Sequence, residues 1–189
     1  MNVQTPRPVP RATYQDVLDA PENKVAELIG GVLYMQARPT PKHCVASSSL
    51  GGELVNPFQK GRGGPGGWWI LDEPELHLGD DVLVPDLAGW RRDRMPSLPE
   101  TAWFDIAPDW ACEILSPSTR RVDLFAKRPV YAEHGVRHLW LIDPVARILE
   151  AFELREGTWV LVATLADEAE VALAPFNAVP FALNELWGE

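Results

Sequence analysis

The sequence predicts an α/β fold of the α+β type, in which helices flank a mixed β-sheet. Three observations lead to this prediction. Hydrophobic residues make up 46% of the chain and charged residues 23%, the proportions of an ordinary globular protein. The length of 189 residues suits one domain with a hydrophobic core. Segments with helical spacing of apolar residues are interspersed with strand-like segments, and no internal repeat is present.

The chain begins with a segment that is rich in proline and lacks periodicity. We expect residues 1–12 to form a flexible arm and residues 13–189 to form a single domain. Thr13 followed by Asp16 is typical of a helix start with an acidic first turn, and Pro21 ends this helix. Val25–Ile29 and Val32–Met35 then flank two glycines, Gly30 and Gly31, which predicts a tight β-hairpin.

Apolar residues recur at helical spacing between residues 41 and 59, although two glycines weaken the middle of this helix. A glycine-rich loop follows over residues 61–67. Three strand-like segments come next, and the first of them is expected to bend at Pro74. These strands are predicted over residues 68–78, 82–90 and 110–115.

The last third of the chain predicts one helix and three more strands. Residues 123–134 have a helical pattern, Gly135 suits the C-terminal cap, and Pro129 is an anomaly inside the helix. Turn residues at Asp143-Pro144 and Glu156-Gly157 separate the strands. The strands are predicted over residues 138–142, 148–154 and 159–165, with one helical turn within residues 181–187.

Charge and composition restrict the location and the partners. No apolar run approaches the length of a membrane span and no signal peptide is visible, so we expect a cytoplasmic protein without membrane contact. Cys44 and Cys112 are far apart in the chain and are expected to be buried thiols. The net charge of −10 is opposite to that of most nucleic-acid binders. Positive charge is clustered locally, in Arg91, Arg92 and Arg94 and in Arg120, Arg121, Lys127 and Arg128.

Two carboxylates stand in apolar strand contexts. Asp86 follows Val84 and Pro85 at the end of an apolar strand, and Glu113 lies inside another apolar strand. An ionised carboxylate in such surroundings needs a cation or strong hydrogen-bond donors beside it. Carboxylates on neighbouring strands supply the hard oxygen ligands that Mg²⁺ prefers. Taken alone, Pro85-Asp86 after a strand is ordinarily a solvated turn, and Glu113 could face solvent on an edge strand.

The order and spacing of several motifs resemble the Uma-type putative restriction endonuclease family, a branch of the PD-(D/E)xK nuclease superfamily. The resemblance spans most of the chain. It includes Glu27-Leu28-Ile29 with Gly31, His43, Val84-Pro85-Asp86, the run from Glu113 to Thr119, Asp123, Lys127, Tyr131, Gly135-Val136 and the run from Trp140 to Pro144.

The resemblance implies a restriction-endonuclease-like fold and a metal site. It implies that Asp86 and Glu113 bind Mg²⁺ or Mn²⁺, and that Glu27 supplies a further carboxylate. Leu115 stands where the superfamily motif has its lysine, so Lys127 on the next helix is the candidate replacement. His43 and Tyr131 are candidates for substrate contact or for support of the site. His43 alone could be a helix cap or a surface residue.

The leading hypothesis is therefore metal-dependent hydrolysis of nucleic-acid phosphodiesters. The ammonium of Lys127 would orient or deprotonate the attacking water, or neutralise charge on the scissile phosphate. The resemblance favours DNA as the substrate. A homodimer is expected because cutting both strands of a duplex needs two sites. The alternative is a non-catalytic binding or regulatory module that retains the nuclease fold.

Overall fold

The computed structural model describes residues 11–36 and 38–188. Residues 1–10 of the expected N-terminal arm lie outside this range. At its end, the backbone N–H of Ala12 donates a hydrogen bond of 2.9 Å to the carbonyl oxygen of Gly31. In the part of the chain that the structure describes, no helix has both the length and the apolar character that crossing a bilayer requires.

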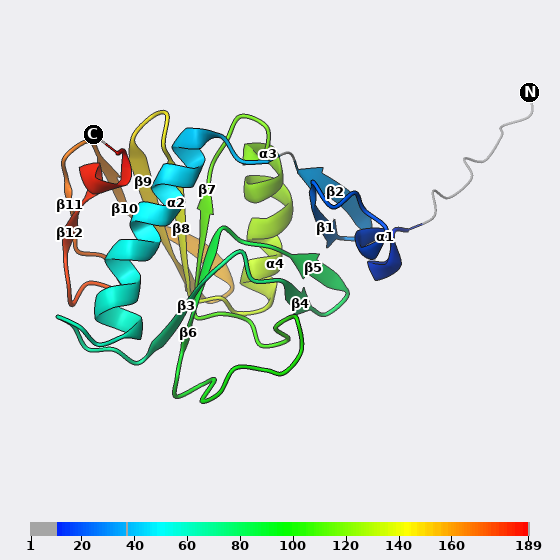
Figure 1. Cartoon of the computed structure of the whole chain (residues 1–189), viewed down its shortest axis with the longest axis horizontal. Helices are drawn as coiled ribbons and strands as arrows, with labels where there is room; N and C mark the ends of the chain where they lie inside the picture. The colour runs from blue at the N-terminus through cyan, green and yellow to red at the C-terminus, as the bar shows by residue number, and fades with distance from the viewer. Residues whose placement is uncertain (1–10, 37, 189) are drawn as a thin grey trace, which may run out of the picture.

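A mixed six-stranded sheet forms the centre of the molecule, as the sequence predicts (Figure 1). The strand order is β10-β9-β8-β7-β6-β3, and β7 and β8 are its parallel pair. Each other neighbouring pair in this sheet is antiparallel. The strands are β3 (Trp68–Asp72), β6 (Leu87–Arg91), β7 (Trp110–Ile114), β8 (His138–Asp143), β9 (Ile148–Arg155) and β10 (Thr158–Ala166).

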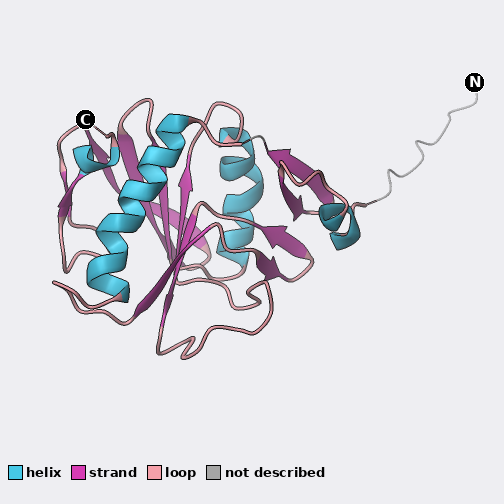
Figure 2. Cartoon of the chain, in the orientation of Figure 1, coloured by secondary structure: helices cyan, strands magenta, loops and turns pink. Residues whose placement is uncertain are grey.

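Two hydrophobic cores lie on opposite faces of this sheet, because successive side chains of a strand alternate between the faces. Trp110, Cys112 and Ile114 belong to the core that contains the buried side chains of α2 (Pro41–Leu54). Ala111 and Leu115 belong to the second core, with Tyr131 of α4 (Arg128–Glu133). Figure 2 shows these helices on the two sides of the strands. Cys112 is buried as expected, whereas Cys44 is exposed and corrects that expectation.

A second, antiparallel sheet has the order β2-β1-β5-β4. It contains the predicted hairpin, β1 (Val25–Ile29) and β2 (Val32–Gln36), beside α1 (Tyr14–Leu18). Its other strands are β4 (Leu76–Leu78) and β5 (Asp81–Leu83). A two-stranded sheet, β11 (Glu170–Val171) and β12 (Phe181–Ala182), precedes a 3-10 turn over Leu183–Leu186.

The strand segments predicted over residues 68–78 and 82–90 are each divided between the two larger sheets. The bend expected at Pro74 is confirmed as a break, and the prediction of one continuous strand over residues 82–90 is wrong. The first breaks at Glu73, whose φ of 45° lies in the left-handed region, followed by Pro74. The second breaks at Pro85, which has no N–H to donate to a ladder. The chain therefore crosses from the four-stranded to the six-stranded sheet at Asp86.

Both long helical segments contain π-helical turns. α2 continues into a π-helical turn, η1 (Val55–Gln59), so the predicted helix over residues 41–59 is confirmed. The second segment consists of α3 (Arg120–Val122), the π-helical turn η2 (Asp123–Lys127) and α4. This wider turn precedes Pro129, whose ring would clash with a carbonyl in an uninterrupted α-helix. The helix begins at Arg120, three residues before the predicted start.

Candidate active site

Asp86 lies in the crossing between the two sheets and is held at both carboxylate oxygens. Oδ2 accepts a hydrogen bond of 2.6 Å from the backbone N–H of Ile114. Oδ1 lies 3.0 Å from Nε2 of His43. His43 is in the first turn of α2, which Thr40 caps by accepting a hydrogen bond from the His43 backbone N–H at 3.4 Å. The start of α2 and the end of β7 therefore fix this carboxylate.

Glu113 is a buried carboxylate on the face of β7 that meets α4, with 2% of its surface exposed. Its Oε1 accepts a hydrogen bond of 2.5 Å from the Tyr131 hydroxyl, and its Oε2 lies 2.9 Å from Nζ of Lys127. Burial raises the pKa of Glu113 well above its ordinary value; Lys127 lowers it, and neighbouring carboxylates raise it further. Burial therefore disfavours the ionised form of Glu113 unless a cation lies beside it.

Lys127 supplies positive charge to the centre of the site. Its ammonium lies 2.9 Å from Glu113 Oε2, 3.0 Å from Glu27 Oε1 and 2.9 Å from the carbonyl oxygen of Val84. These three acceptors match its three N–H donors. Burial alone would lower the pKa of Lys127, but the surrounding carboxylates raise it well above its ordinary value. Lys127 is therefore a protonated donor near neutral pH.

Glu27 lies behind the ammonium and is completely buried. Its Oε1 accepts a hydrogen bond of 2.8 Å from the backbone N–H of Val84 and contacts Lys127. Its Oε2 accepts a short hydrogen bond from the side-chain amide of Gln36. Glu27 is not among the residues that line the cavity in front of Lys127. Its position connects the hairpin to Lys127.

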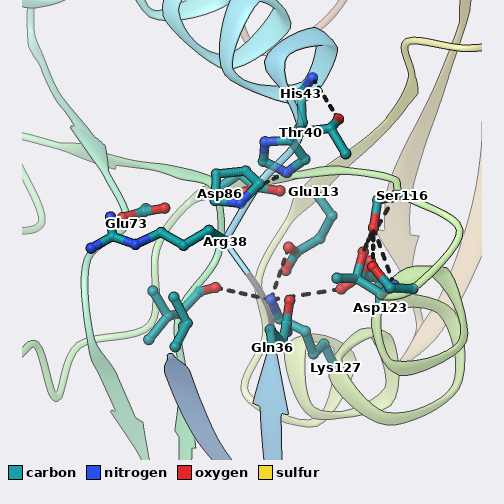
Figure 3. Close-up of a pocket in the computed structure, with 15 residues that line it drawn as sticks. Gln36, Arg38, Thr40, His43, Glu73, Asp86, Glu113, Ser116, Asp123 and Lys127 are labelled. Atoms are coloured by element: carbon teal, nitrogen blue, oxygen red, sulfur yellow. Dashed lines mark hydrogen bonds and ion pairs between the residues drawn. The ribbon is translucent and has the colours of Figure 1, made fainter. Parts of the chain in front are cut away.

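A small cavity of about 50 Å³ opens in front of these residues (Figure 3). Gln36, Arg38, Glu73 and Asp123, to which the sequence analysis assigns no role, are among the other residues that line it. Asp123 lies 3.8 Å from Lys127, and burial is the main cause that raises its pKa to about 6. In the sequence, Asp123 is marked only by its place in the family motif. No sequence pattern marks Gln36, Arg38 and Glu73, because the fold brings them to the cavity from distant parts of the chain.

The first turns of two helical segments meet at this cavity. Thr40 and His43 belong to the start of α2, and Ser118 and Thr119 immediately precede α3; all four line the cavity. Ser116 Oγ lies 3.0 Å from Thr119 Oγ1, so the hydroxyls of this turn are linked to each other. Helix N-termini carry partial positive charge and free N–H groups, which favour anions. The cavity thus combines carboxylates with an anion-attracting rim.

The donor chemistry at the cavity fits a hard divalent cation. Four carboxylates, those of Glu27, Asp86, Glu113 and Asp123, surround the two cationic groups Lys127 and His43, so ionisation of all four requires additional positive charge. Within residues 11–36 and 38–188, no group of three or more His, Cys, Asp or Glu side chains forms a metal cage. Mg²⁺ does not need one, since it is usually held by one or two carboxylates together with water and phosphate oxygens.

The fold and the carboxylate–lysine cluster define a nuclease-like protein. A crystal structure described as a "putative nuclease belonging to DUF820 from Anabaena variabilis ATCC 29413" has the same fold, with a TM-score of 0.74. The two chains are 24% identical, and the match covers 93% of this chain and 97% of that chain. The protein belongs to the Uma2 family, described as "Putative restriction endonuclease", whose model matches residues 12–184. A comparison with curated proteins found no match.

Proposed function

We propose that this protein is a metal-dependent endonuclease that hydrolyses phosphodiesters of DNA. The observation that carries this proposal is the cluster of Asp86, Glu113 and Lys127 at a cavity where two helices begin. Carboxylates suit a metal ion, and helix N-termini suit a phosphate. Membership of a family described as restriction endonucleases supports the same chemistry.

Asp86 and Glu113 would hold Mg²⁺ or Mn²⁺. When bound, such an ion supplies Lewis-acid stabilisation of negative charge on a phosphate group. His43 and the N–H of Ile114 orient Asp86, and the Tyr131 hydroxyl orients Glu113. These contacts keep the two carboxylates directed at the cavity and limit their rotation.

Lys127 would stabilise negative charge on the scissile phosphate. Because its pKa is raised, it is a poor acceptor of a proton from water, and the electrostatic role is favoured over that of a general base. Glu27 would be a positioning residue, since it contacts Lys127 from behind and does not line the cavity. This role differs from the further metal-site carboxylate that the sequence implied.

A cleavage assay tests the proposal. Supercoiled, linear and single-stranded DNA and an RNA are incubated with the protein and Mg²⁺ or Mn²⁺. We expect cleavage of DNA that EDTA and Glu113→Gln both abolish. Glu170→Gln, at an exposed glutamate of β11, is the matched control and should cut normally. Metal binding without cleavage of any of these substrates would contradict the proposal and favour a non-catalytic module that retains the fold.

A further inference from the structure

A second cavity lies at the opposite end of the central sheet from the candidate active site. Its volume is about 490 Å³, within the range of small-molecule sites. Arg91 ends β6 and His138 begins β8, whereas Asp86 precedes β6 and Glu113 lies near the end of β7 (Figure 1). The strand length of β6 separates the two cavities. The lining includes Trp68 of β3, Arg91, Arg92, Arg137 and His138.

The acidic residues of this second cavity already have partners. Asp93 forms an ion pair with Arg91. Asp109 accepts a hydrogen bond of 2.8 Å from the Arg91 backbone N–H and lies 2.8 Å from the Arg94 guanidinium. These contacts neutralise both carboxylates, so they do not cancel the charge of the remaining arginines.

Arg92 has no carboxylate partner within the described part of the chain. Its guanidinium lies 3.9 Å from the ring centre of Trp69. It also donates hydrogen bonds of 3.2 Å to the carbonyl oxygens of Trp68 and Gln59. The cation is therefore held in place by an aromatic ring and neutral oxygens, which leaves its charge available to a ligand.

Two further groups add to the positive character of this cavity. Arg137 and Arg155 both pair with Glu153. The Arg137 guanidinium lies 3.6 Å from this carboxylate, whereas the Arg155 guanidinium lies 2.8 Å from it. The ring of His138 has no hydrogen-bond partner among the described residues. Burial lowers the pKa of His138, and the charge of Arg137 lowers it further, which is consistent with a positive local field.

We propose that this cavity binds a free mononucleotide. Arg92, Arg137 and His138 would hold the phosphate, because guanidinium and imidazole N–H groups donate to phosphate oxygens. Trp68, fixed by an edge contact with Phe176 at 5.0 Å between ring centres, would pack against the base. The volume of about 490 Å³ is sufficient for one nucleotide.

The test is calorimetric titration of the full-length protein in EDTA with adenosine 5′-monophosphate, inorganic phosphate and adenosine. We expect saturable 1:1 binding of the nucleotide, about tenfold tighter than either fragment. Arg137→Gln should weaken nucleotide binding about tenfold, the typical effect of losing a charge-assisted hydrogen bond, which corresponds to about 1.4 kcal/mol.

Two control variants make the result specific. Arg155→Gln removes the other arginine that pairs with Glu153. The side chain of Arg155 is 59% exposed, similar to the 67% of Arg137, but Arg155 does not line the cavity. Arg38→Gln alters the candidate active site instead. Both should bind the nucleotide like the wild type. The proposal is overturned if no binding of the nucleotide is detected up to 10 mM, about the weakest useful affinity. It is also overturned if adenosine binds as tightly as the nucleotide, or if Arg137→Gln and either control variant lose the same amount of nucleotide affinity.

Discussion

At the level of single residues, the buried ammonium of Lys127 faces three carboxylates, those of Glu27, Glu113 and Asp123. Replacing Lys127 by Met leaves these carboxylates without their cation. We expect Lys127→Met to lower the free energy of unfolding by about 3 to 5 kcal/mol at pH 8, the usual cost of breaking a buried pair. Urea unfolding in EDTA measures this loss.

Replacing the carboxylate partner Glu113 should destabilise the protein much less than replacing Lys127. Glu113→Gln leaves Lys127 paired with Glu27 and removes one of the mutually repelling carboxylates. We expect its unfolding free energy in EDTA to stay within about 1 kcal/mol of the wild type. Equal destabilisation by Glu113→Gln and Lys127→Met would mean that Glu113 is a purely structural partner of the lysine.

The lysine can be moved from position 127 to position 115, where the superfamily motif has it. Leu115 follows Glu113 by two residues and packs in the core on the same face of the sheet. If Lys127 acts on the phosphate, Lys127→Ala should abolish DNA cleavage while metal binding persists, and the double variant Leu115→Lys with Lys127→Ala should recover part of it. Loss of Leu115 packing costs about 2 to 5 kcal/mol, so circular dichroism must first show a folded protein. Full activity of Lys127→Ala would exclude the displaced-lysine mechanism.

Asp123 predicts a pH dependence of stability. Its pKa rises from 3.8 to about 6 on folding, so the folded state retains a proton that the unfolded chain loses between these values. The contribution of Asp123 to stability therefore falls as the pH rises from about 4 to 6. We expect Asp123→Asn to gain up to about 3 kcal/mol relative to the wild type between pH 4 and pH 8. A constant difference across this range in urea unfolding would refute the assignment.

The sequence located most of the cluster but not its internal contacts. Strand context and motif order selected Asp86, Glu113 and Lys127, and the structure brings all three to one place. Lys127 and Tyr131 are four residues apart in one helical segment, and both contact Glu113. The position of Glu27 behind the lysine, and the presence of Gln36, follow from docking of the hairpin against a helix far away in the chain, which no local pattern encodes.

At the level of elements, the glycines of α2 offer a test of helix propensity. Gly52 is exposed, and a Cβ atom there would meet nothing within 4 Å. We expect Gly52→Ala to stabilise the protein by about 0.5 to 1 kcal/mol, because alanine loses less backbone entropy in a helix. The comparison variant is Gly64→Ala. A Cβ atom at Gly64 would lie 2.5 Å from Pro57, so this substitution should destabilise the protein. Thermal unfolding of both variants decides the matter.

Element types were predictable, whereas the assignment of strands to sheets was not. The hairpin, the helices and the last three strands follow from glycine pairs and apolar periodicity. Pro74 predicted the bend in the first segment, but the break at Pro85 was not predicted. Nor was the division of both segments between two sheets, since a run of apolar residues looks the same whether its two halves enter one sheet or two. The pattern of apolar side chains indicates which residues are buried, but it does not indicate which neighbouring strand or helix buries them.

At the level of the whole molecule, metal binding should be visible as heat stability. A ligand that binds only the folded state raises the melting temperature in proportion to the logarithm of its concentration. We expect Mg²⁺ or Mn²⁺ at millimolar concentration to raise the melting temperature by a few degrees, and Asp86→Asn to remove most of this increase. The absence of any rise in the wild type up to tens of millimolar (about 40 mM) would remove the main support for the metal site.

The contact between Glu27 and Lys127 has a consequence for synthesis of the chain. The hairpin is translated before Lys127 and can form by local pairing, but Glu27 then has no cation beside it when it is buried. The residue that completes its environment is made one hundred positions later. Nascent chains that end before Lys127 therefore leave the carboxylate of Glu27 without its cation and have no assembled site. The candidate active site can thus assemble only after Lys127 has been translated.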